Sequence, residues 1–459
     1  MLKKLFAPTD MTVGSVWKSI VTFTLPMLLG NVAQQLYSTV DTIVVGKYAE
    51  NGDNAIAAVG SALPVLNMLL VLFIGISAGA GVMVSQYFGA KKREDLSYTV
   101  GNCLVITAIA CAGLIVVAAP FIRPALVMLN TPESILEDCY AYLMISLVGI
   151  AGMAYYNILS GIIRGLGDSV SGLIYLLVAT LINIVLDLFF VAVLHMDVAG
   201  VALATIVAQM ISSVLCALKL SRMREHFDFG RRYMRLKSRY VKTVVKLGLP
   251  SGLTQAIFSS AMIVVQSLTN RFGEQFIAAN VVVMRVDGFA MMPNFSFGTA
   301  LTTFAGQNVG AGKYDRVMKG AKQGTLLAVG CSTAITGILL LFGKPLMAVF
   351  SETADLVDLS YSLMQILAVG YIAVAVTQSL SGIMRGAGDT MTPMWISLIT
   401  TVLFRVPLAY GISYLTRTAE LPYGQSWCIQ VSLLGSWVMG AVLTLIFYRF
   451  GRWKHKKLN

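Results

Sequence analysis

The chain has 459 residues, of which 57% are hydrophobic and only 12% are charged, and its mean hydropathy is +0.76. Soluble globular proteins carry a charge on about a quarter of their residues. These values exclude a soluble domain, a disordered chain and a disulfide-stabilised scaffold, and they predict a protein that crosses a membrane many times.

A transmembrane helix needs roughly 20 consecutive apolar residues. Twelve apolar stretches follow one another along the chain, at 17–46, 55–88, 97–119, 138–164, 170–194, 198–221, 241–270, 275–306, 320–342, 356–384, 391–416 and 424–448. We therefore predict an all-α polytopic membrane protein with twelve transmembrane helices. The first stretch should be retained in the mature protein, because it contains polar residues and lacks a cleavage site after a short core.

The net charge of +12 is distributed unevenly over the predicted loops. The N-terminus, the even-numbered loops and the C-terminal tail hold 27 Lys and Arg residues, whereas the odd-numbered loops hold 5. Positive residues accumulate on the cytoplasmic side of membrane proteins. The sequence therefore predicts that both termini are cytoplasmic, and it argues against a nucleic-acid partner as the reason for the charge.

A basic stretch at 222–240 separates two related halves, an N-terminal lobe (1–221, helices 1–6) and a C-terminal lobe (241–459, helices 7–12). LSGIIRGLGDS at 159–169 is followed 221 residues later by LSGIMRGAGDT, with 8 of 11 positions identical. Six helices are an even number, so both lobes enter the membrane from the same side and are related by a pseudo-two-fold axis along the membrane normal. Such duplicated bundles favour an alternating-access transporter; a static scaffold or a channel is the alternative.

Polar residues fall on single faces of three helices in the first lobe. They comprise Gln34, Tyr37 and Asp41 in the first helix, Asn183 and Asp187 in the fifth, and Thr205 and Gln209 in the sixth. Ionisable groups at membrane depth are costly and indicate a functional site. Facing one another, these stripes would offer oxygen ligands for a proton or a hard monovalent cation. The alternative is that they join the helices by mutual hydrogen bonds.

The second lobe carries a different polar stripe. At the repeat offset of 221 residues, Asn183 and Asp187 correspond to Phe404 and Leu408, so the acidic pair is not duplicated. The eighth helix instead presents one face with a single acid and two methionines, namely Asn280, Met284, Asp287, Met291 and Asn294. A carboxylate among deformable methionines predicts a site for a cationic, amphipathic substrate. The alternative is a structural ion pair of Asp287 with Arg405 or Arg285.

Several motifs together resemble the multidrug and toxic compound extrusion (MATE) family over nearly the whole chain. They are Pro26 and the VDTIVVG run containing Asp41, the Q-x-x-G-A and R-G-x-G-D turns of both halves, NIVLD at 183–187 and AGVALAT at 199–205. The last two are similar to the branch of the DNA-damage-inducible members. This resemblance implies that Asp41, Asn183, Asp187 and Thr205 form a cation-coupling site.

The residues and the resemblance lead to one functional hypothesis, a secondary antiporter in the bacterial inner (cytoplasmic) membrane. It would export cationic or amphipathic compounds in exchange for H⁺ or Na⁺, with Gln34, Tyr37, Gln209 and the eighth-helix stripe binding the substrate. We expect a monomer without cofactor, metal site or enzymatic activity, because scattered cysteines and histidines and the absence of a nucleotide-binding loop offer none. The alternative function is a lipid-linked precursor or polysaccharide flippase.

Overall fold

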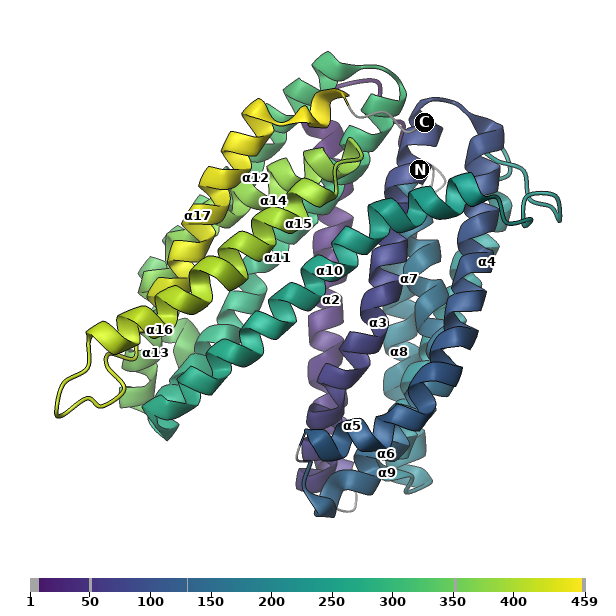
Figure 1. The fold of residues 1–459 in the computed structure, drawn as a ribbon. Coiled ribbons are helices and arrows are strands. Elements are labelled where there is room, and N and C mark those ends of the chain that lie inside the picture. Colours follow the sequence, from purple (N-terminus) through teal and green to yellow (C-terminus); the bar gives the residue numbers. More distant parts are fainter. Residues whose placement is uncertain (1–7, 49–51, 130, 351–352, 456–459) are drawn as a thin grey trace. The chain divides into compact units, whose positions relative to one another are not determined.

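A computed structural model describes residues 8–48, 52–129, 131–350 and 353–455, apart from the side chains of residues 36–43, 45, 46, 52, 53, 56, 452 and 455. Within these ranges all regular structure is helical (Figure 1). Ten helices or helix runs are long and apolar enough to cross a membrane, and two further bent helix pairs bring the number to as many as twelve. The prediction of an all-α polytopic membrane protein is confirmed.

The described part of the first half of the chain contains eight α-helices, α2 to α9, joined by short connections (Figure 1). Their bounds are α2 Val16–Tyr48, α3 Gly52–Gly89, α4 Arg93–Ala118, α5 Ile122–Met128, α6 Glu133–Val148, α7 Ile150–Gly165, α8 Val170–Asp187 and α9 Asp197–Arg222. A short 3-10 turn, Ala119–Phe121, joins α4 to α5, and a π-helical segment, Leu188–Val193, continues α8.

The second half has the same plan. Its helices are α10 Ser238–Thr269, α11 Glu274–Gly310, α12 Tyr314–Ala348, α13 Ala354–Ala368, α14 Gly370–Gly386, α15 Met391–Leu398, α16 Val406–Leu415 and α17 Cys428–Phe450. A 3-10 turn, Asn270–Phe272, ends α10, and a second, Arg452–His455, follows α17. A second π-helical segment, Ile399–Arg405, links α15 to α16, and the three pieces form one long rod in Figure 1.

The predicted fourth and tenth spans are both broken in the middle. The axes of α6 and α7 differ by 52°, and those of α13 and α14 by 44°. The breaks lie at Gly149 and at Val369–Gly370, and Gly149 and Gly370 are 221 residues apart, so the bend is part of the repeat. A β-carbon on Gly149 would lie 2.4 Å from Ile206 of α9, and one on Gly370 would lie 2.5 Å from Trp437 of α17. Each bend therefore rests against the last span of its own half.

The chain folds into two compact units whose limits differ from the predicted division at residues 221 and 241. The N-terminal unit comprises Met1–Asp10 and Leu25–Gly252, and the C-terminal unit comprises Met11–Thr24 and Leu253–Asn459. The first part of α2 thus belongs to the C-terminal unit, and the first part of α10 belongs to the N-terminal unit. Hydrogen bonds and close glycine contacts explain both assignments.

The segment before α10 packs on α4 within the N-terminal unit. The Arg93 guanidinium donates hydrogen bonds to the Asp228 carboxylate and to the carbonyl oxygens of Glu225 and Arg224, at 2.7–3.1 Å. Further along the chain, a β-carbon on Gly79 of α3 would lie 2.4 Å from the Val244 carbonyl oxygen of α10. The stretch predicted as a linker is therefore folded onto the unit that precedes it.

The segment before α2 is held in the same manner within the C-terminal unit. Arg316 of α12 donates three hydrogen bonds, to the carbonyl oxygens of Met11 at 3.0 Å and of Val13 and Gly14 at 2.7 Å each. Gln307 accepts a hydrogen bond from the Met11 backbone N–H at 2.9 Å. Each half of the chain thus begins with a segment that is anchored by an arginine near the turn between the second and third spans of the other half.

Candidate functional site

The polar face of α8 lies inside the N-terminal unit. The buried residues of α8 include Leu176, Ala179, Asn183 and Asp187, which recur every three or four positions and therefore share one face. Asn183 is 0% exposed and Asp187 is 1% exposed. Asp187 also ends the α-helix, and the π-helical segment begins at the next residue. Single π-helical turns inside α-helices are frequent at functional sites.

Helix α9 brings the predicted Thr205 alongside Asn183. The two helices are consecutive spans and run in opposite directions, and Ser212 Oγ of α9 donates to the Tyr175 carbonyl oxygen of α8 at 3.3 Å. Asn183 is eight residues after Tyr175, and Thr205 is seven residues before Ser212. Because the two helices are antiparallel, Asn183 and Thr205 lie at about the same height along the helix pair. Gln209 is partly buried one turn away, and its Oε1 is buried with no hydrogen-bond partner among the side chains that the structure describes.

The candidate residues of the first helix, Gln34, Tyr37 and Asp41, all lie on α2. Gln34 is exposed on α2. The side chains of Tyr37 and Asp41 lie outside the described residues, although both positions are helical. Gly30 of α2 faces α8, because a β-carbon there would lie 3.7 Å from Leu173 and 3.9 Å from Leu176. The second part of α2 therefore packs beside α8 within the N-terminal unit.

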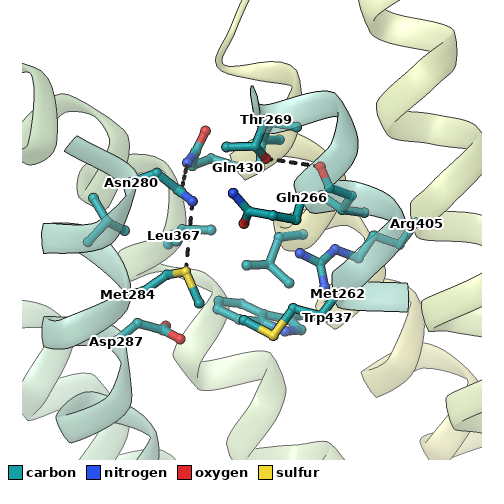
Figure 2. A pocket seen from close by; sticks show the side chains of 14 residues that line it. Met262, Gln266, Thr269, Asn280, Met284, Asp287, Leu367, Arg405, Gln430 and Trp437 are labelled. Carbon is teal, nitrogen blue, oxygen red and sulfur yellow. Dashed lines mark hydrogen bonds between the residues drawn. The ribbon is translucent and has the colours of Figure 1, made fainter. Parts of the chain in front are cut away.

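The C-terminal unit contains a cavity of about 150 Å³ with a mainly apolar lining and a few polar side chains. Its walls come from α10, α11, α13, α17 and the π-helical segment, and Figure 2 shows the side chains that line it. The lining residues are Met262, Val265, Gln266, Thr269, Asn280, Val283, Met284, Asp287, Leu367, Arg405, Ile429, Gln430, Leu433 and Trp437. Three members of the predicted eighth-helix stripe, Asn280, Met284 and Asp287, are among them.

The remaining two members of that stripe lie elsewhere on α11. Met291 belongs to the apolar core of the unit and is 9% exposed. Asn294 is fully buried, where its amide donates to the Tyr371 carbonyl oxygen at 3.3 Å and its Oδ1 accepts from Ser332 at 2.7 Å. Both are absent from the cavity lining because α11 enters the packed interior after Asp287. Met291 and Asn294, which were predicted to contact substrate, therefore do not line this cavity.

Amide and aromatic contacts fix the cavity walls. Gln430 donates through Nε2 to Asn280 Oδ1 at 2.9 Å, and the Asn280 amide faces Met284 Sδ at 3.8 Å (Figure 2). Trp437 packs on Tyr371 with ring centroids 5.6 Å apart. The sequence analysis missed Gln266, Thr269, Gln430 and Trp437. Gln266 and Thr269 share a face of α10, which was the one available signal, whereas Gln430 and Trp437 are isolated in α17.

The two charges of the cavity do not form the direct ion pair that was the alternative to a substrate site. Tyr371 and Arg405 are the polar neighbours of the Asp287 carboxyl. Among the ion pairs within 4.0 Å that the described residues form, none joins Asp287 to Arg405. The Asp287 carboxyl has a side-chain hydrogen bond with Tyr371, whereas its Oδ1 and the Nε of Arg405 are buried and find no hydrogen-bond partner among the described residues. Arg285, the other partner considered, is exposed and outside the cavity.

The repeated R-G-x-G-D turns have a structural role. Asp168 accepts hydrogen bonds from the backbone N–H and hydroxyl of Ser171 at 2.9 and 2.6 Å, and Asp389 accepts from Thr392 in the same way at 3.3 and 2.6 Å. The preceding Gly167 and Gly388 have φ angles of 94° and 93°, which other residues rarely adopt. These turns therefore start the fifth and eleventh spans. The described residues include no group of three His, Cys, Asp or Glu side chains that could hold a metal ion.

Comparison with known proteins agrees with this architecture. The sequence profile of the MatE family matches residues 26–189 and again residues 250–411, one match for each half. A probable multidrug resistance protein of Bacillus subtilis, YoeA, is 28% identical over 97% of this chain and 96% of its own length. A probable multidrug resistance protein NorM of Thermotoga maritima is 24% identical, over 97% and 94% respectively.

A solved structure shares the fold. It is described as the outward-facing conformation of a multidrug resistance MATE family transporter, and it superposes with a TM-score of 0.88 at 22% identity, covering 96% of this chain and 97% of that one. The two profile matches together cover well over half of the chain. The resemblance inferred from the motifs is thereby confirmed: the chain belongs to the MatE family and is a multi-pass membrane transporter, not an enzyme.

Proposed function

We propose that this protein is an antiporter that exports cationic or amphipathic small molecules from a bacterial cell in exchange for H⁺ or Na⁺. The exchange would proceed by alternating access across the inner membrane, with both termini in the cytoplasm, as the 27 to 5 distribution of basic residues indicates. The observation that carries the proposal is the pair Asn183 and Asp187, buried on the inward face of α8. The names of the YoeA and NorM relatives support the multidrug part.

Helix register supports a role for Asp41 beside Asp187. The first and fifth spans run in the same direction, and Gly30 of α2 packs against Leu176 of α8. Asp41 is 11 residues beyond Gly30, and Asp187 is 11 residues beyond Leu176. Eleven residues make about three helical turns. This count places Asp41 and Asp187 at the same level of the N-terminal unit, where Asn183 and Thr205 add an amide and a hydroxyl.

Such a group of oxygen donors suits a proton or sodium ion. Two carboxylates that share one site cannot both ionise easily, so they titrate as a coupled pair and can exchange a proton near neutral pH. The substrate would use the cavity of the C-terminal unit, where Asn280, Met284 and Asp287 combine an amide, a deformable surface and a negative charge. Binding of ion and substrate would each lower the affinity for the other.

The flippase alternative has less support from the cavity. A lipid-linked pyrophosphate would need a strongly positive wall, whereas the described lining contains one acid, Asp287, beside one base, Arg405. A channel is less well supported too, because a filter needs symmetric groups and the acids of the two units differ in position.

Transport by proteoliposomes tests the proposal. Asp187→Asn and Asp41→Asn should abolish efflux of an organic cation driven by a proton or sodium gradient, while detergent-solubilised protein keeps its melting temperature and its binding of the cation. Asp358→Asn is the matched control, because Asp358 is 62% exposed and pairs with Lys344 on the surface. Normal gradient-driven efflux by both variants would place the coupling site elsewhere.

A further inference from the structure

The cavity of the C-terminal unit holds two opposite charges that are neighbours but do not form a direct ion pair within 4.0 Å among the described residues. Asp287 comes from α11, whereas Arg405 is the last residue of the π-helical segment. Figure 2 shows both side chains at the cavity, Asp287 with the α11 residues and Arg405 apart from them. Each keeps one buried polar atom that has no hydrogen-bond partner within the described part of the chain, Oδ1 of Asp287 and Nε of Arg405. A purely structural pair would be expected to make the direct, bidentate contact that Arg and carboxylate groups favour.

The wider helical turns before Arg405 explain how this separation is maintained. Residues 399–405 form a π-helix, and the α-helical geometry resumes at Val406. A π-helical insertion changes the direction in which the following side chain points. Because the spacing is set by the backbone of one helix and by α11, the two charges are held as separate parts of the wall. Leaving them unpaired in the membrane is unfavourable unless a ligand compensates them.

The remaining walls provide a further acceptor and a flat apolar surface. Gln430 uses its Nε2 for Asn280, and its Oε1 is buried without a partner. Trp437 is held by its contact with Tyr371, while Met262 and Met284 contribute sulfur-containing surface. A cavity of 150 Å³ can enclose a benzene-sized group. The lining thus offers hydrogen-bond acceptors for a cationic group and a donor for an anionic group. It also offers an apolar surface for a small ligand that carries both groups.

We propose that this cavity is a binding subsite for a zwitterionic group, with a ligand ammonium at Asp287 and a ligand carboxylate at the Arg405 guanidinium. The proposal rests on the proposed export function and narrows its substrate class from cations to molecules that also carry an anionic group. The ligand would be a zwitterion of about benzene size, or the zwitterionic end of a larger molecule.

Four small ligands test the contributions of Asp287 and Arg405 to binding without any mutation. They are 4-(aminomethyl)benzoate, its methyl ester, benzylamine and benzoate, and their affinities for the purified full-length protein in detergent can be measured by isothermal titration calorimetry. The zwitterion should bind about tenfold or more tightly than the ester, because only the zwitterion makes a charge-assisted hydrogen bond to Arg405. Equal affinity of the zwitterion and the ester would overturn the proposal.

Variants assign each charge to its partner. Arg405→Gln should reduce the affinity for the zwitterion to that for the ester and leave the ester unchanged. Asp287→Asn should weaken the zwitterion, the ester and benzylamine together, but not benzoate. Arg285→Gln is the matched control, an exposed arginine of α11 outside the cavity, and should change nothing.

Two further features keep the test decisive. If Arg405→Gln does not fold, Arg405→Lys retains the positive charge and should preserve most of the preference for the zwitterion over the ester; loss of that preference with normal folding would contradict the assignment of the ligand carboxylate to this positive charge. The measurements use no ion gradient and compare all four ligands at one pH and one sodium concentration, so any effect of the Asp187 site applies to all of them and does not depend on transport. A missing zwitterion preference together with normal Asp187-dependent efflux would reject the subsite alone, whereas the reverse result would reject only the coupling site.

Discussion

The two units share a scaffold but differ in where they carry their charges. Both have a span broken near equivalent glycines, Gly149 and Gly370, and both place a π-helical segment in the next span. The N-terminal unit buries an acid on α8 just before its π-helical segment, whereas the C-terminal unit places an arginine at the end of its own segment and an acid on α11. The two halves therefore share the broken span and the π-helical segment, but they differ in the charged side chains placed next to these features.

The largest expected effect separates the two acids. Asp187→Asn should reduce gradient-driven efflux of every transported compound to background, because it removes the proposed coupling group. Asp287→Asn should instead change the relative efflux of different compounds, because it alters only the cavity wall. Efflux profiles for a panel of cations and zwitterions in proteoliposomes measure both. Identical profiles for the two variants would remove the functional distinction between the units.

A second comparison separates cavity wall from core within α11. Met291 is packed in the apolar core, so Met291→Ala should destabilise the protein by about 2–5 kcal/mol and leave ligand preference unchanged. Met284 is 39% exposed at the cavity, so Met284→Ala should alter the relative affinities of bulky and small ligands at little cost in stability. Thermal unfolding in detergent and ligand titration report the two effects. A shift in ligand preference for Met291→Ala would return that residue to the substrate site.

The bends provide a third test. Alanine at Gly149 would press on Ile206, and alanine at Gly370 would press on Trp437, so each change should cost about 1–3 kcal/mol of stability. Because Trp437 lines the cavity, only Gly370→Ala should also weaken zwitterion binding. Gly337→Ala is a suitable control, since a β-carbon at Gly337 has no atom within 4 Å. Equal loss of binding for both bend variants would mean that the bends do not act locally.

Smaller effects are expected at the two anchored segments. Arg93→Ala should increase amide hydrogen exchange several-fold in residues 224–228 only, and Arg316→Ala should do so in residues 11–14 only, because each guanidinium holds one segment by several hydrogen bonds. Hydrogen-exchange mass spectrometry measures both variants, and each variant serves as the control for the other. Loosening of both segments by one variant would show that they are coupled.

The segment held by Arg93 should also respond to acid. Burial lowers the pKa of His226 below its ordinary value of 6.5, against the influence of Glu225, and a hydrogen bond from Arg93 holds the pKa of Asp228 below its usual range. Both groups bind fewer protons when docked than when free, so docking should weaken as the pH falls below about 6.5. Hydrogen exchange at 224–228, corrected for intrinsic rates, should rise at pH 5.5. His226→Phe retains a ring against Phe88 and should remove the His226 part.

The sequence was sufficient for features that depend on local pattern. Hydropathy predicts the spans, the 221-residue offset predicts the repeat, and the spacing of Asn183 and Asp187 predicts their common buried face. The breaks at Gly149 and Gly370 depend on contacts with Ile206 and Trp437, which are distant in sequence, so hydropathy shows only continuous spans there. Gln430 and Trp437 have no polar periodicity around them, and their role becomes visible only when α10, α11 and α17 meet at the cavity.

The position of the two anchored segments has a consequence for cutting the chain. A protease that cleaves at 229–236, within the basic stretch between the halves, leaves one fragment that still carries residues 11–24 of the C-terminal unit. The other fragment still carries residues up to Gly252, which belong to the N-terminal unit. Each fragment therefore contains a helical piece that completes the other, so a nicked protein should stay together and separately synthesised halves should assemble with one another.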